Sequence, residues 1–194
     1  MPRPLAKSPF VLLSVLLWIF ASSTCLAADD DLESLNQRIY KLFAEGKYQE
    51  AIPLAEKAVE IATRVRGPEN PETATSLNNL GQLYFNVYQY TKALALLQEA
   101  LRIRQKVLGK EHPYTAFSLN NLAELYQAMT EYAKAEPLYQ EALRIRQKVL
   151  GSEHPDTAET LNNLGTLYQA MGRYREAEPL LQEALQTYRK GFGP

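Results

Sequence analysis

Residues 119–143 read LNNLAELYQAMTEYAKAEPLYQEAL, and this stretch decides the fold. A first apolar stripe, spaced i, i+3, i+4 and i+7, consists of Leu119, Leu122, Ala123 and Tyr126. A second stripe follows a short turn at 129–131 and contains Ala135, Leu138, Tyr139, Ala142 and Leu143. Stripes of this spacing are typical of amphipathic helices that bury one face. The stretch therefore predicts two antiparallel helices joined by a tight turn.

The same pattern returns every 42 residues. Equivalent positions hold Tyr48, Tyr90, Tyr132 and Tyr174, and likewise Ala51, Ala93, Ala135 and Ala177. One helix pair cannot bury its apolar face alone, so neighbouring pairs must stack. The sequence predicts an all-α solenoid of four antiparallel helix pairs over residues 28–194, with units that begin near residues 32, 74, 116 and 158.

These motifs resemble the tetratricopeptide repeat family, in particular its 42-residue kinesin-light-chain type. The resemblance covers residues 35–194 and is carried by LNNLAELY (119–126), AEPLYQEAL (135–143) and GSEHPDTA (151–158). It implies a right-handed superhelix whose first helices line a concave groove that holds a peptide or a partner-protein segment.

The resemblance also implies which residues contact a ligand in this groove. Asn79, Asn121 and Asn163 form the central row, and an Asn amide offers both a donor and an acceptor to the backbone of an extended peptide. The alternative is that these amides hydrogen-bond between neighbouring helices and hold the superhelix together. The other candidates, which lie in the same row or one helical turn to either side, are Gln37, Tyr40, Gln82, Glu124, Thr166, Thr75 and Phe117. Family members that bind C-terminal carboxylates use Lys and Arg here, and the matching positions carry neither.

Residues 1–27 have the layout of a secretory signal peptide. Two basic residues precede an apolar run over residues 10–21, which is shorter than the roughly 20 residues that a transmembrane helix needs. The small residues Cys25 and Ala27 predict cleavage after Ala27. The alternatives are lipidation of Cys25 and retention of the segment as an anchor. The sequence predicts a secreted or periplasmic protein.

Composition and spacing exclude several functions. The chain has 21 Lys+Arg and 22 Asp+Glu, a net charge of −1 that gives no general basis for binding nucleic acid. Basic residues near the helix C-termini, Arg104 and Arg146 among them, are interpreted as partners of the helix dipole. His112 and His154 lack the spacing of metal ligands, and no nucleophile stands beside a positioned base. We expect no metal, no cofactor and no catalysis.

The expected function is that of a noncatalytic protein-interaction module. Its partner is a protein or a peptide, with no nucleic acid and no membrane contact after signal cleavage. The alternatives are a structural subunit that self-associates and an accessory component of an envelope assembly. Self-association as a homo-oligomer is expected through the C-terminal unit, where apolar residues lie in positions that earlier units present to the next helix pair: Leu181, Leu185 and Tyr188.

Overall fold

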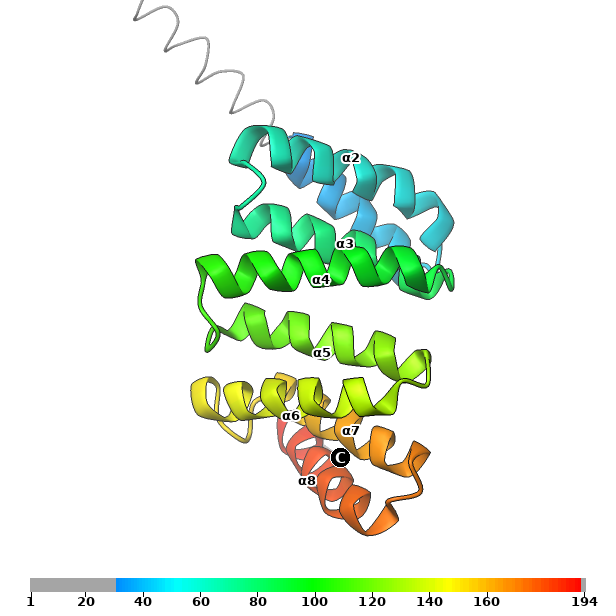
Figure 1. Ribbon diagram of the computed structural model, residues 1–194, viewed down its shortest axis with the longest axis vertical. Helices are drawn as coiled ribbons and strands as arrows, with labels where there is room; N and C mark the ends of the chain where they lie inside the picture. The colour runs from blue at the N-terminus through cyan, green and yellow to red at the C-terminus, as the bar shows by residue number, and fades with distance from the viewer. Residues whose placement is uncertain (1–30, 193–194) are drawn as a thin grey trace, which may run out of the picture.

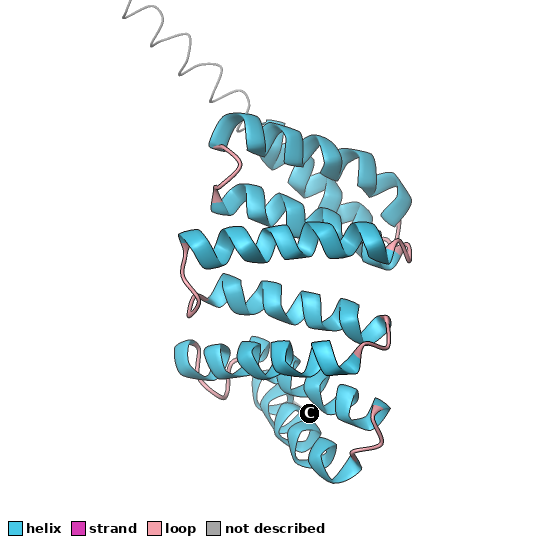
Figure 2. Cartoon of the chain, in the orientation of Figure 1, coloured by secondary structure: helices cyan, strands magenta, loops and turns pink. Residues whose placement is uncertain are grey.

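The computed structural model describes residues 31–192, and every regular element in that range is a helix (Figure 2). The segment predicted to be a signal peptide, residues 1–27, lies outside the described residues. The helical residues 31–44 are followed by α2 (Tyr48–Arg66), α3 (Pro71–Asn86), α4 (Tyr90–Val107), α5 (Pro113–Ala128), α6 (Tyr132–Val149), α7 (Pro155–Ala170) and α8 (Tyr174–Phe192). From α2 to α8 the helices follow one another along the long axis, with residues 31–44 behind α2 (Figure 1), which confirms the predicted all-α helical repeat fold.

We call 31–44, α3, α5 and α7 the first helices, and α2, α4, α6 and α8 the second helices. Three of these first helices, α3, α5 and α7, have the same N-terminal cap. Each has Pro at its first turn, where the missing N–H removes no helical hydrogen bond. The side chain of the preceding residue accepts a bond from the backbone N–H two positions on: Asn70 from Glu72 at 2.8 Å, His112 from Tyr114 and His154 from Asp156, both at 3.1 Å. Both histidines therefore act as helix caps.

The turn within each helix pair requires a left-handed backbone. Gly46 and Gly172 provide it in the first and last pairs, with φ of 71° and 73°. The middle pairs place Tyr88 and Thr130 there, at φ of 62° and 60°. A residue with a Cβ atom is strained in this region, and a β-branched residue most of all. The two middle turns therefore carry backbone strain that the outer turns avoid.

Buried alanines set the distance between helices. Ala93 and Ala100 of α4 and Ala135 and Ala142 of α6 have no exposed surface. Leucine, isoleucine and tyrosine side chains fill the layers between the helices that these alanines bring together. Stability comes from this packing, repeated from pair to pair.

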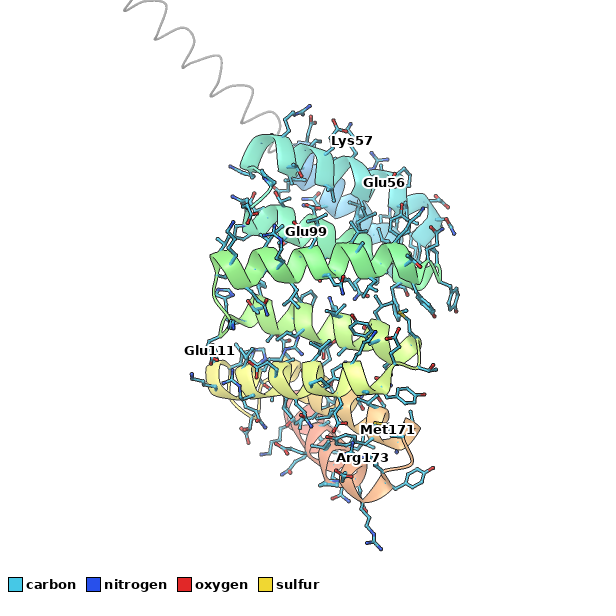
Figure 3. All side chains as sticks on the ribbon, viewed as in Figure 1. Glu56, Lys57, Glu99, Glu111, Met171 and Arg173 are labelled. Carbon is cyan, nitrogen blue, oxygen red and sulfur yellow. The ribbon has the colours of Figure 1, made fainter. Side chains whose placement is uncertain are left out.

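Ion pairs tie each loop between pairs to the second helix of the following pair. Glu69 pairs with Arg102 at 2.8 Å and with Lys106 at 3.1 Å. Glu111, labelled at the left edge of Figure 3, pairs in the same way with Arg144 and Lys148 of α6. Such exposed pairs contribute little individually, about 0–1 kcal/mol.

No helix within residues 31–192 is both long and apolar enough to cross a bilayer. In the same range, no three His, Cys, Asp or Glu side chains come together as metal ligands.

Candidate interaction groove

The first helices form the inner face of the solenoid. Direct contacts join α3 to α5 and α5 to α7, whereas within the described residues no comparable contact joins α4 to α6. A stack whose first helices approach more closely than its second helices must curve toward the first helices. Side chains that leave this face line the concave side, as the resemblance implies.

The paired asparagines connect neighbouring first helices. The Nδ2 of Asn121 donates to the Oδ1 of Asn78 at 3.1 Å, and the Nδ2 of Asn163 donates to the Oδ1 of Asn120 at 3.3 Å. Both acceptors are 1% exposed. Each of these two amides therefore uses one N–H to hold neighbouring repeats together, which is the alternative interpretation of these residues. Their remaining capacity to contact a ligand stays a prediction.

Asn79 has a different environment, because it lines a cavity of about 210 Å³ between residues 31–44, α3 and α5. The walls are mostly apolar, and the lining residues are Ile39, Tyr40, Phe43, Asn78, Asn79, Gln82 and Phe117. Four of the predicted groove residues, Tyr40, Asn79, Gln82 and Phe117, thus come together at one place. Tyr40 is 58% exposed, so the cavity opens to solvent beside its ring.

A second hollow, of about 400 Å³, adjoins the cavity at Tyr40. Its lining residues are Leu32, Glu33, Asn36, Gln37, Tyr40, Arg66 and Glu72. The Nε of Arg66 donates to a carboxylate oxygen of Glu72 at 2.8 Å. The predicted residue Gln37 lies in this hollow rather than in the cavity.

The two predicted threonines bond within the protein. The hydroxyl of Thr75 donates to the Pro71 carbonyl at 3.0 Å and accepts from Arg104 Nη2 at 3.1 Å. The hydroxyl of Thr166 donates to the Asn163 carbonyl at 2.8 Å. Neither residue lines the cavity, so a ligand would meet them only further along the face.

Two arginines are buried between the second helices and the first helices. Arg104, 2% exposed, donates to the Ser118 hydroxyl at 2.7 Å, and burial lowers its pKa to about 10. Arg146, 1% exposed, donates to the Thr160 hydroxyl at 2.6 Å and to Glu159 at 3.0 Å. These bonds join α4 to α5 and α6 to α7. Helix-dipole attraction therefore does not describe their main role, which is to bridge buried hydroxyl and carbonyl groups.

Glu124 occupies in α5 the position that Gln82 holds in α3 and Tyr40 holds in the first described helix. Its side chain is half-buried. Desolvation raises the pKa of this carboxyl, and the nearby Glu159 carboxylate raises it further. No basic side chain within the described residues pairs with it.

The three residues predicted for self-association lie in different environments. Leu181 is half-buried beneath Gly165, where its side chain occupies the space that a Cβ would need. Tyr188 packs against the buried cluster that contains Ala158. Leu185 is 50% exposed and lines a hollow of about 410 Å³ on α8. Of the three, Leu185 presents the most apolar surface to a second molecule.

Sequence reasoning did not single out Ile39, Phe43 or Asn78, which complete the cavity. Their positions carry a usable signal, since Ile39 and Phe43 are one helical turn apart on the face of Tyr40. The register of Arg104 is equally informative, because it falls four residues after the buried Ala100. Helical phase could therefore have placed Arg104 on the buried side.

Comparison with known proteins bears out the resemblance. The sequence matches the tetratricopeptide repeat family over residues 31–86, 87–148 and 118–190. A search of curated proteins found no match. Among solved structures, a putative kinesin light chain from Podosopora anserina with nearly identical TPR-like repeats is 31% identical, with a TM-score of 0.72. This chain aligns over 82% of its own length and 75% of that chain.

Two further structures are similar over more of this chain. BtubC (BKLC) from P. vanneervenii is 25% identical with a TM-score of 0.72, over 84% of this chain and 65% of that one. The apo form of RapI is 20% identical with a TM-score of 0.71, over 84% of this chain and 57% of that one, and shows the fold alone. This chain thus spans less than two thirds of either protein. Because the family match covers most of the 194 residues, the chain belongs to the tetratricopeptide repeat family.

Proposed function

We propose that the protein is a noncatalytic interaction module that holds an extended segment of a partner protein on its inner face. Tetratricopeptide repeat proteins generally mediate protein–protein interactions, which supports this class of function. The observation that carries the proposal is the cavity of about 210 Å³, where four residues predicted to contact a ligand meet.

The chemistry of the cavity suits a peptide. A cavity of roughly 150 Å³ with apolar walls is large enough for a benzene ring, so this one has room for an aromatic or large aliphatic side chain. The amides of Asn79 and Gln82 lie at the same place and can pair with the backbone on either side of that anchor. Apolar walls with a few polar groups are typical of binding sites that orient their ligand.

The test is affinity capture of partners from source cells, comparing wild type with a Tyr40→Ala, Phe117→Ala double variant. Tyr174→Ala is the matched control, because Tyr174 is exposed on α8, far along the chain from the cavity. We expect a partner that the wild type and the control retain and the double variant loses, with unchanged circular dichroism. Retention of every partner by the double variant would refute binding at the cavity.

We further propose that the protein acts outside the cytoplasm, as a secreted or periplasmic component of an assembly. The proposal rests on the order of basic, apolar and small residues over residues 1–27. Trp18 is the only tryptophan, so cleavage after Ala27 removes all tryptophan absorbance. The mass of the exported protein should match residues 28–194, and a full-length mass would contradict cleavage.

Self-association is a second candidate, and the exposed Leu185 favours it. Analytical ultracentrifugation of wild type and Leu185→Glu tests it directly. A concentration-dependent dimer that the substitution abolishes would support a structural role. A monomer at all concentrations would leave the groove as the functional surface.

A further inference from the structure

The inner face carries acidic charge that the protein itself does not neutralise. The charged residues that line the hollow beside the cavity are Glu33, Glu72 and Arg66. Further along the inner face, Glu124 of α5 lies near Glu159 of α7. Glu72 is paired with Arg66, and Glu159 with the buried Arg146. Glu33 accepts only a long bond of 3.5 Å from Gln37. Within residues 31–192, Glu33 and Glu124 are left without a basic partner.

The basic side chains at this surface are already engaged within the protein. Arg66 lines the hollow, but its Nε pairs with a carboxylate oxygen of Glu72 at 2.8 Å. The Arg104 guanidinium lies 5.7 Å from the centre of the Phe117 ring in the cavity wall, but Arg104 is 2% exposed and bonds to Thr75, Ser118 and the Tyr114 carbonyl. An acidic ligand would therefore meet unpaired carboxylates rather than a free cation. Like charges that face each other across an interface disfavour binding, so the surface selects against acidic segments.

The distance from the cavity to Glu124 sets the spacing between the two ligand side chains that would contact them. Phe117 lines the cavity, and Glu124 follows it by seven residues, two turns along the same face of α5. With a rise of 1.5 Å per residue, their Cα atoms are about 10 Å apart along the helix axis. An extended chain advances about 3.3 Å per residue and covers this distance in about three residues.

We propose that the partner segment inserts an apolar side chain into the cavity and places a Lys or Arg about three residues away, where it pairs with Glu124. This inference rests on the proposed function, because it defines the ligand of the same groove. Glu124 is half-buried, so water and salt screen a pair with it less than they screen a pair on the open surface. The cation compensates the desolvation that the Glu124 carboxylate experiences in the free protein.

The experiment uses three synthetic nine-residue peptides in a Gly/Ser/Thr background. The first contains Phe and, three residues later, Lys; the second has Glu in place of Lys; the third has Ala in place of Phe. Binding to the full chain is followed by NMR chemical-shift perturbation at low salt. We expect the Phe–Lys peptide to perturb amides near Phe43, Gln82 and Glu124. Replacing its Lys with Glu, or its Phe with Ala, should weaken binding by about tenfold, the effect of about 1.4 kcal/mol.

Two protein variants test whether Glu124 is the residue that recognises the Lys of the peptide. Glu124→Gln should weaken binding of the Phe–Lys peptide about three- to tenfold, as expected for loss of a partly buried ion pair. Glu183→Gln removes the same charge from an exposed site on α8 and should leave binding unchanged. If both variants weakened binding equally, the loss would come from the change in net charge and not from a pair with Glu124. That result would overturn the inference.

The outcomes separate this inference from the proposed function. If the Phe–Lys and Phe–Glu peptides bind the cavity equally well, the preference for a cation is wrong while groove binding stands. If no peptide with Phe perturbs the inner face, both proposals fail.

Discussion

The Nδ2 of Asn121 donates a hydrogen bond to the Oδ1 of Asn78 at 3.1 Å, which joins two successive repeats through the inner edges of their first helices. The residues are 43 positions apart, one more than the repeat period, and Asn163 bonds to Asn120 with the same offset. The second amide of one pair thus satisfies the first amide of the preceding pair. An inner face that looks like a row of ligand contacts is partly a row of contacts between repeats.

Asn121→Ala should destabilise the protein by about 1–3 kcal/mol, because the Asn78 carbonyl oxygen is buried and would lose its donor. Asn79→Ala is the control, since Asn79 lines the cavity and is not joined to another asparagine within residues 31–192. Chemical denaturation of both variants measures the difference. Equal loss of stability would contradict the assignment of Asn121 to the packing of repeats.

Thr130→Gly should stabilise the protein by about 1 kcal/mol, because Thr130 has a φ of 60° that a β-branched residue adopts at a cost. The reverse change, Gly172→Thr, places threonine at the equivalent turn, where φ is 73°, and should destabilise by a similar amount. Thermal denaturation tests both. Opposite signs are expected, and a loss of stability in Thr130→Gly would show that the turn is not strained.

Ala135→Phe should cost roughly 1–3 kcal/mol, because Ala135 has no exposed surface and the added ring must displace its neighbours. Ala133→Phe, two positions earlier on the exposed side of α6, should cost much less. The melting temperatures of the two variants distinguish a buried position from an exposed one. An unchanged melting temperature for Ala135→Phe would contradict the close approach of these helices.

Glu111 should make stability depend on acid pH. Hydrogen bonds from Arg144 and then Lys148 lower its pKa from 4.5 to about 2. A carboxyl whose pKa is lowered in the folded state contributes stability above its unfolded pKa and loses it as pH falls toward the folded value. Wild type should therefore be more stable than Glu111→Gln at neutral pH, and the difference should shrink between about pH 4.5 and 2. High salt should reduce the same difference, whereas a pH-independent difference would rule out this ion pair as its source.

The sequence predicts the fold well because the pattern that indicates a helix pair occurs in every repeat. Each helix pair of the 42-residue period gives the same apolar stripe, so one ambiguous position such as Pro137 inside α6 does not change the prediction. The inner face is also predictable, because Tyr40, Gln82 and Phe117 sit on the same side of the first helices and do meet at one cavity.

The partners of individual side chains are harder to predict. The offset of 43 residues between bonded asparagines depends on how each first helix crosses the next, which a periodic sequence does not specify. Arg104 and Arg102 both lie near the end of α4, yet one is buried among hydroxyls and the other is exposed and paired with Glu99. The difference in burial between Arg104 and Arg102 follows from their positions around the helix. The groups that accept hydrogen bonds from Arg104 are known only from the packed structure.

Site-specific photocrosslinking tests the central claim most directly. A photoreactive phenylalanine analogue placed at Phe117 in the cavity wall is compared with the same analogue at Tyr174, and irradiation is performed in source cells. The account predicts a covalent adduct with a partner protein at position 117 and none at position 174. An adduct at position 174 alone would place the interaction surface outside the groove and contradict the account.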